Sequence, residues 1–428
     1  MFSNFRDSKL LKGIIHVASG NSVAQIIVLL AAPVITRIYS PEIFGIQGVF
    51  LAAISLLAPI AAFRYPMAIV VAENELEVKR LTALSLVTAT VVSTILFFVI
   101  FFFRTQVSDL LGLDGIGLLI FFLPIALIMT ALQEISNYTA SRKQRFRPIS
   151  IVSAIQSLAV NLARILGGIV SPTANVLISI SSIAPGLHAA MLSGSQLIKT
   201  KFRKLARSDF SILKSTAIRY REFPIFRTPT DFLNAASQTA PVLLLSLFFT
   251  PAVAGLYTLT RSTMTLPSNI IGNAIGTVFY SHFAERHRGG HRLTNSSTKA
   301  TLGLLLGPGV LLIIFAYFGP VIFEIFFGEA WREAGVYARW VSIATAFSIA
   351  NVPAVKLAPV INRQGALLLL NVFLFVTRAG AILIIGLIGG TALSAVICYS
   401  LVSALGSFVL IITMLLLASI DDRRNAVK

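Results

Sequence analysis

Charged residues are scarce in this 428-residue chain, and acidic residues are scarcer than basic ones. Asp, Glu, Lys and Arg together make up 12% of the residues, with 17 acidic against 35 basic, while 56% are hydrophobic. A mean hydropathy of +0.85 excludes an ordinary soluble protein. We therefore expect an all-α membrane protein, because helices satisfy their own backbone groups in lipid.

The chain also has little of the side-chain chemistry that enzymes and metalloproteins use. Its single cysteine, Cys398, excludes an internal disulfide and a cysteine metal site. The histidines form no cluster at metal-ligand spacing, and no Walker A sequence provides for an ATP-driven pump. We therefore expect no cofactor, no bound metal and no catalytic residue.

Long apolar runs are what the sequence has instead. About 20 apolar residues cross the roughly 30 Å core of a bilayer. The run that begins at residue 13 is too long for a cleaved signal peptide, so we predict an uncleaved first span. The predicted spans number about twelve: 13–38, 43–71, 81–103, 115–140, 149–170, 175–198, 224–249, 253–283, 301–327, 336–361, 367–388 and 392–418.

Lys and Arg are distributed unevenly over the loops between these spans. The side that holds both termini carries 25 of them, whereas the opposite side carries only Arg104 and Arg332. The positive-inside rule therefore predicts a multi-pass protein of the inner membrane with both termini in the cytoplasm. This membrane interpretation accounts for most of the net charge of +18, and no soluble basic domain is present to hold nucleic acid.

A weak internal repeat divides the chain. Residues 248–255 echo residues 38–45, with a proline and a glycine recurring after 210 residues. Six spans per half give a parallel repeat, so we predict two six-helix lobes, 1–198 and 224–428, around a central cavity. The basic segment 199–223 joins them and is predicted to form an amphipathic helix on the inner membrane surface.

Several charges remain inside the predicted spans. A charge at a span centre costs about 2.5–3.5 kcal/mol on insertion scales, so such residues usually face the protein interior. Residues near span ends can instead extend to the membrane surface. The deeper basic residues outnumber the deeper acids, which predicts a net positive interior; ion pairing with the acids is the structural alternative. The basic residues are Arg64, Arg164, Arg261 and Arg378, with Lys356 intermediate, and the acids are Glu134 and Asp231.

Polar residues accompany these charges at helical spacing. Asn234 and Gln238 follow Asp231 on one helical face, and Asn269 follows Arg261 in the next span. In the first span, Asn21 and Gln25 lie one turn apart. These stripes predict a polar cavity, and the alternative is helix packing through small and polar side chains.

Several stretches carry a family resemblance, the most specific being FGEAWREAGVYA at 327–338. Others are YSPEIFG at 39–45, FRYPMAIV at 63–70, RKQRF at 142–146 and REFP at 221–224. The chain resembles oligosaccharide flippases of the Wzx type, in the multidrug/oligosaccharidyl-lipid/polysaccharide exporter superfamily. The resemblance implies alternating-access transport of undecaprenyl-pyrophosphate-linked oligosaccharide, as in O-antigen, capsule or exopolysaccharide synthesis. Membrane lipids, and a complex of polysaccharide polymerase and chain-length proteins, are candidate partners.

A positive, polar cavity would suit a pyrophosphate because arginine binds phosphate bidentately. Asp231 and Glu134 are candidates for coupling to H⁺ or Na⁺. The alternatives are a cation-coupled multidrug exporter, a membrane glycan polymerase or glycosyltransferase, and a scaffold that does not transport. The positive interior disfavours the first and the short outer loops disfavour the enzymes. The candidate substrate-binding residues are Arg64, Arg164, Arg261, Arg378, Lys356, Asn21, Gln25, Asn234, Gln238 and Asn269.

Overall fold

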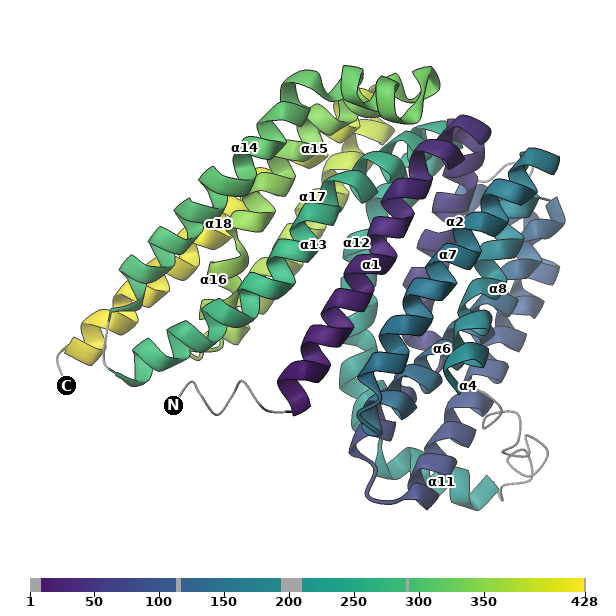
Figure 1. Ribbon diagram of the computed structural model, residues 1–428, viewed down its shortest axis with the longest axis horizontal. Helices are drawn as coiled ribbons and strands as arrows, with labels where there is room; N and C mark the ends of the chain where they lie inside the picture. The colour runs from purple at the N-terminus through teal and green to yellow at the C-terminus, as the bar shows by residue number, and fades with distance from the viewer. Residues whose placement is uncertain (1–8, 113–116, 194–209, 290–291, 427–428) are drawn as a thin grey trace. The chain divides into compact units, whose positions relative to one another are not determined.

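The computed structural model describes residues 9–112, 117–193, 210–289 and 292–426, and every element within these ranges is a helix (Figure 1). Contacts divide the chain into two compact units, Met1–Ala254 and Gly255–Lys428. The division assigns residues 224–249, the first span of the predicted second lobe, to the first unit. The two predicted six-helix lobes and the cavity between them stay a prediction.

Unit 1 contains the elements α1 to α12. They are α1 (Lys9–Ile38), α2 (Pro41–Ala61), α3 (Tyr65–Ala68), η1 (Ile69–Val71), α4 (Glu75–Phe102), α5 (Arg104–Leu111), η2 (Gly117–Phe121), α6 (Phe122–Arg142), α7 (Phe146–Val170), α8 (Ala174–Ser193), α11 (Phe210–Arg219), the π-helix η3 (Phe223–Arg227) and α12 (Thr228–Phe248).

Unit 2 contains most of α13 and all the elements after it. They are α13 (Pro251–Arg288), α14 (Leu293–Phe327), η4 (Glu329–Trp331), α15 (Arg332–Ala350), α16 (Val352–Leu357), α17 (Gln364–Leu387) and α18 (Ala392–Ala426). Here α14 packs on α15, and α18 packs on both α15 and α17. Gly319 and Gly335 allow the backbones of α14 and α15 to meet, because a Cβ on either would collide with the other's carbonyl oxygen.

Eight helices of the described residues are long and apolar enough to cross a membrane, which supports a multi-pass membrane protein. Val170 on α7 is 86% exposed and Leu369 on α17 is 73% exposed, as expected of side chains that face lipid. Each of the twelve predicted spans overlaps a helix, although twelve crossings stay a prediction. The eight are Pro41–Ala61, Glu75–Phe102, Gly117–Arg142, Phe146–Val170, Ala174–Ser193, Glu329–Leu357, Gln364–Leu387 and Ala392–Arg423.

The structure corrects several predicted boundaries. The predicted span 43–71 is broken after Ala61, because Phe63 and Arg64 adopt positive φ angles of 46° and 56° before α3 begins. The predicted outer loop 104–114 contains the helix α5. Within the predicted linker helix, the described part is α11, and residues 199–209 lie outside the described residues.

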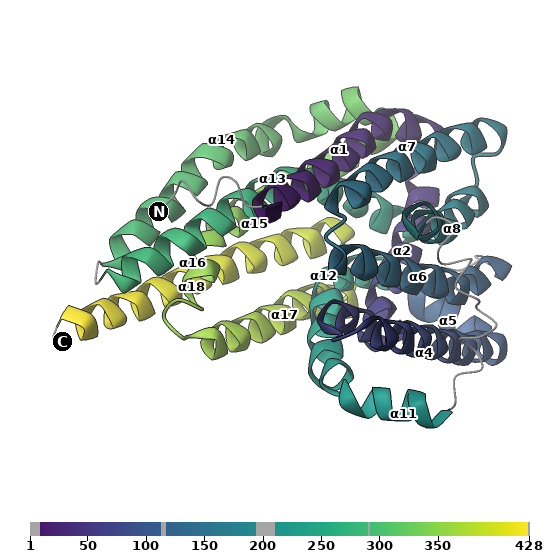
Figure 2. The same ribbon diagram turned by 60° about the horizontal axis from the view of Figure 1, so that its bottom comes forward.

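The helices of unit 1 pack in sequence-distant pairs. α1 lies along α7, α6 along α8, and α12 along α2. Figures 1 and 2 both show α11 at one end of this unit, next to the start of α4. That end also holds the turns after α2 and α6, and the charge distribution predicts that it faces the cytoplasm.

Candidate functional site

A buried charge cluster lies at this end of unit 1, where α2, α6 and α12 meet. Arg64 pairs through Nη1 with Glu134 of α6, and its Nε lies 2.9 Å from Oδ2 of Asp231 on α12. The second contact is an ion pair whose geometry is not that of a hydrogen bond. The same Asp231 oxygen lies 3.3 Å from Nε of Arg227, one turn earlier. Two guanidiniums and two carboxylates thus neutralise one another.

The backbone explains why Arg64 reaches both acids. It follows the end of α2 in the left-handed region (φ 56°, ψ 11°), and Pro66 occupies the first turn of the short helix α3, where its missing N–H is tolerated. The exposed fractions are 16% for the Arg64 side chain, 22% for Glu134 and 15% for Asp231. For Arg64, the structure therefore shows ion pairs with acids, which was the structural alternative to an unpaired positive charge.

Arg164 has a different environment in the same unit. Its Nη2 donates to Oγ of Ser181 on α8 at 3.2 Å, and Gln47 of α2 donates to the same oxygen at 2.8 Å. Tyr39 donates to the Arg164 carbonyl at 2.8 Å. The Arg164 Nε is buried without a hydrogen-bond partner, and no described carboxylate lies within ion-pair distance. A hydroxyl, and not an acid, holds this guanidinium.

Unit 2 contains a comparable arginine. Nη2 of Arg378 on α17 lies 3.4 Å from both the carbonyl oxygen of Ser403 and Oγ of Ser407 on α18, and its Nε is buried without a partner. Nearby, the rings of Tyr257 and Tyr399 meet edge to face with centroids 6.0 Å apart.

Arg261 joins this group in unit 2. Arg261 and Arg378 both lie close enough to Tyr257 for their charges to influence it, so the structure brings two predicted site residues near this tyrosine. Sequence reasoning missed these tyrosines. The available signal was the spacing of Tyr257 and Arg261, one helical turn apart.

The remaining predicted residues are more dispersed. Lys356 on α16 and Gln25 on α1 are partly buried, and Asn234 and Gln238 on α12 are exposed. The side chains of Asn21 and Asn269 lie outside the described residues. A role for any of these residues in binding substrate stays a prediction.

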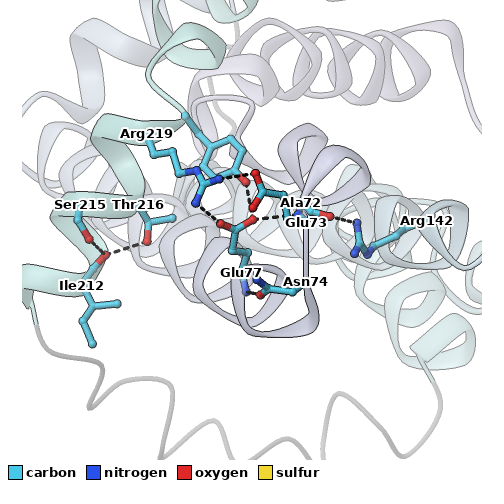
Figure 3. A network of polar contacts seen from close by, with 10 residues as sticks. Ala72, Glu73, Asn74, Glu77, Arg142, Ile212, Ser215, Thr216 and Arg219 are labelled. Atoms are coloured by element: carbon cyan, nitrogen blue, oxygen red, sulfur yellow. Dashed lines mark hydrogen bonds and ion pairs between the residues drawn. The ribbon is translucent and has the colours of Figure 1, made fainter.

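A second polar network, which sequence reasoning also missed, joins α11 to the first turn of α4 (Figure 3). Arg219 pairs with Glu73 at 2.6 Å and with Glu77, and Tyr220 donates to Glu77 at 2.9 Å. Asn74 caps α4 by accepting from the Glu77 amide at 2.9 Å. Burial, followed by the hydrogen bond to Glu77, raises the pKa of Tyr220. Tyr220 therefore stays protonated as the donor.

Arg142, the last residue of α6, contacts the other side of the same segment. It donates to the carbonyl oxygens of Ile69 and Val70 at 3.3 and 3.4 Å, and to that of Ala72. These carbonyl oxygens lie in η1 or directly after it, where no following helical turn supplies backbone N–H donors. Arg142 therefore fastens the segment after Arg64 to α6.

In unit 2, two acidic side chains of α18 contact the ends of other helices. Asp422 of α18 accepts from the backbone amides of Leu293 and Thr294 at 2.9 and 3.0 Å, which caps the start of α14. Asp421 lies 3.5 Å from Nδ1 of His287, near the end of α13. Among the described residues, no group of three or more His, Cys, Asp or Glu could hold a metal ion.

A family model described as polysaccharide biosynthesis protein matches residues 34–336, which is more than half of the chain. The chain belongs to this family. It is also 23% identical over 311 residues to the succinoglycan biosynthesis transport protein ExoT of Rhizobium meliloti (strain 1021). That match covers 71% of this chain but only 59% of the relative.

Solved structures share the fold of this family member. A lipid II flippase, MurJ, in an inward closed conformation has a TM-score of 0.73 at 12% identity, covering 95% of this chain and 90% of the flippase. An inward-facing multidrug resistance MATE transporter has a TM-score of 0.68 at 12% identity, covering 94% and 95% of the two chains. These similarities show that the chain shares its fold with these two proteins.

Proposed function

We propose that the protein is a flippase that moves an undecaprenyl-pyrophosphate-linked oligosaccharide across the inner membrane by alternating access. The family match and the relation to a succinoglycan transport protein support a saccharide cargo. The observation that carries the proposal is the pair of arginines, Arg164 and Arg378, that hydroxyls and carbonyls hold in place of acids. Such guanidiniums keep their positive charge available to an anion.

The cargo explains why buried positive charge would be retained. Its isoprenoid tail can remain in lipid, whereas its pyrophosphate and sugars must leave water. A guanidinium binds a phosphate through two parallel hydrogen bonds and loses less hydration than an ammonium group. Within its own unit, Arg164 of unit 1 or Arg378 of unit 2 would each offer a positive charge that replaces hydration of the pyrophosphate. Asn234 and Gln238 in unit 1, and Tyr257 and Tyr399 in unit 2, are the polar side chains that each unit would offer to the sugars.

Energy for export has two candidate sources. An inside-negative membrane potential favours outward movement of negative charge by about 2.3 kcal/mol per charge for each 100 mV. Coupling to H⁺ or Na⁺ is the second source, and Glu134 and Asp231 are its candidates because they share one buried cluster. Proton uptake by Glu134 would release the Nη1 end of Arg64.

The direct test follows the lipid-linked oligosaccharide itself. In cells that lack the gene, we expect this intermediate to accumulate on the inner leaflet and the surface glycan to be lost. Both defects should be corrected by wild-type protein and by Arg339→Gln, a change at an exposed arginine of α15. Arg378→Gln should be inserted normally but should correct neither defect. Normal surface glycan in cells without the protein would contradict the proposal.

The orientation is tested separately. We propose that both termini lie in the cytoplasm, because the predicted loops on their side carry nearly all of the loop lysines and arginines. Cysteines placed near each terminus in a Cys398→Ser background should react with an impermeant maleimide only after the inner membrane is opened. Labelling of either terminus in intact spheroplasts would contradict this orientation.

A multidrug exporter is the second candidate, since a MATE transporter shares the fold. Cationic drugs favour cavities lined by acids, whereas Arg164 and Arg378 have no described acid partner. Deletion of the gene should therefore leave susceptibility to cationic drugs unchanged. Increased susceptibility with a normal surface glycan would favour this second function.

A further inference from the structure

The Arg64 cluster and the α11–α4 network are connected by three separate stretches of chain. From Arg64, the short helices α3 and η1 lead directly to Glu73 and Glu77. From Glu134, α6 leads to Arg142, which holds η1. From Asp231, the chain leads back through η3 to Arg219. Each of the three stretches that carry the buried cluster thus leads to the same network, whose contacts Figure 3 shows.

The stretch between Arg219 and Asp231 is built to transmit a displacement. Hydrogen bonds continue along it, from the Tyr220 amide to the Thr216 carbonyl at 3.1 Å and from the Ile225 amide to the Arg221 carbonyl at 3.2 Å. It then runs through the π-turns of η3 into α12. A turn at Tyr220 and Arg221 interrupts the helix, but these backbone hydrogen bonds bridge the turn, so a shift of α11 should reach Asp231.

Packing holds the same stretch against the segment that follows Arg64. Tyr220 and Phe223 lie against a buried cluster that includes Ala68, Ile69 and Leu81. Their two rings are 6.5 Å apart. Arg219, however, is 52% exposed and Glu73 is 68% exposed, so water can compete for this ion pair. The second partner of Arg219, Glu77, is only 8% exposed, but on release of Arg219 it would keep the hydrogen bond that it accepts from the Glu73 amide at 2.9 Å.

Charge balance also permits opening. Asp231 pairs with Arg227, one turn earlier on the same moving segment, as well as with Arg64. If this segment withdrew, Asp231 and Arg227 would leave together as a neutral pair. Arg64 would stay paired with Glu134, and the Nε side of its guanidinium would be left open to another anion. Neither acid would be left buried without a partner, which would otherwise be costly.

We propose that Arg219 is a positioning residue for transport: by holding α11 on α4 it keeps Asp231 against Arg64, and its release exposes the Nε side of Arg64 to an anionic head group. The inference rests on the proposed flippase function for the identity of that anion. The position of Asp231 relative to Arg64 does not depend on that function. We call the contact of Arg219 with Glu73 and Glu77 the clamp. The clamp can therefore be tested apart from transport.

The first experiment measures the clamp alone, with full-length protein in nanodiscs. Arg219→Gln should raise amide hydrogen exchange in residues 220–231 at least tenfold. It should also raise the rate at which phenylglyoxal modifies Arg64 at least fivefold, as measured by mass spectrometry. Arg221→Gln is the matched control, because Arg221 is exposed two residues further on and pairs with no described acid. This control should leave both rates at the wild-type value.

Two results of this experiment would overturn the proposal. One is unchanged exchange in 220–231 for Arg219→Gln. The other is faster exchange with unchanged modification of Arg64, which would make the clamp a structural contact only. Arg219→Lys keeps the charge, so phenylglyoxal should modify Arg64 more slowly in this variant than in Arg219→Gln. Equal modification rates in the two variants would contradict the role of the ion pairs.

The second experiment asks whether opening is needed in the transport cycle. Glu73→Cys and Arg219→Cys are combined in a Cys398→Ser background and joined with a cleavable bismaleimide. Joining should stop flipping of lipid-linked oligosaccharide in vesicles, and cleavage should restore it. An unchanged rate in the joined protein would overturn the proposal. If wild-type protein moves no such lipid, the proposed function fails, and the first experiment still decides the clamp.

Discussion

Arg64 and Arg164 are both arginines of unit 1 that the sequence places inside apolar spans, yet their surroundings differ. Arg64 contacts two carboxylates, and Arg164 contacts a serine hydroxyl that it shares with Gln47. The first arrangement cancels charge and the second preserves it. Depth within a span therefore does not reveal what a buried arginine does. In this arrangement, the partner decides whether the arginine's charge is neutralised by acids or is available to an anion.

The largest effect is expected from Arg64→Met. It would leave Glu134 and Asp231 buried with only the half-exposed Arg227 to compensate them. Breaking a buried ion pair from one side costs about 3–5 kcal/mol, and we expect a loss of stability of this size. Unfolding in detergent, followed by denaturant or heat, measures it.

The acids provide the control for this prediction. Adding Glu134→Gln and Asp231→Asn to Arg64→Met removes the uncompensated charges and should recover most of the lost stability. An Arg64→Met protein as stable as wild type would show that this arginine is not needed for charge balance. The contrast with Arg164 would then disappear.

Arg164→Met should behave in the opposite way. No described carboxylate loses its partner, so stability should change little, while flipping should fall by roughly 10- to 100-fold, as expected for losing a charged hydrogen bond of about 1.5–3 kcal/mol. Arg164→Lys should not restore the rate, because an ammonium group cannot form the bidentate phosphate contact. Flipping at the wild-type rate in Arg164→Met would remove this residue from the site.

Glu134→Gln tests whether the paired cluster also couples transport to an ion. The change leaves Arg64 in contact with Asp231, so the protein should fold and insert. We expect flipping to continue but to lose its dependence on a proton or sodium gradient, measured in vesicles with each gradient imposed in turn. A gradient dependence identical to wild type would leave the cluster with a structural role only.

Ser181→Ala should give the smallest effect. The hydroxyl accepts from Arg164 and Gln47 and donates to the carbonyl of Leu177, so its removal leaves two donors without this partner. A neutral hydrogen bond contributes about 1 kcal/mol, which corresponds to roughly fivefold in flipping rate. Ser182→Ala, at the neighbouring buried hydroxyl that donates only to the Ile178 carbonyl, is the control and should leave the rate unchanged.

The sequence predicted the helical fold well, because apolar length alone identifies helices in a membrane protein. It did not predict the break after Ala61, since the positive φ angles of Phe63 and Arg64 contradict the usual preference of non-glycine residues. It also missed α5, whose polar sequence is typical of a loop.

The candidate site was predictable only in part. Arg64, Glu134 and Asp231 were recognised as unusual because each places charge in an apolar run. Their mutual contact depends on how α2, α6 and α12 pack, and Arg64 and Glu134 are 70 residues apart in sequence. The hydroxyl partner of Arg164 could not be predicted from the sequence for another reason. Serine is common in packed membrane helices, so Ser181 carried no distinguishing signal.

The flipping rate of a labelled lipid-linked oligosaccharide in vesicles tests the central claim most directly. An impermeant reagent that destroys the label on the outer leaflet would report how quickly the inner pool becomes accessible. We predict fast exchange with wild-type protein and at least tenfold slower exchange with Arg164→Met of equal stability. Wild-type vesicles that exchange no faster than vesicles without protein would contradict the claim.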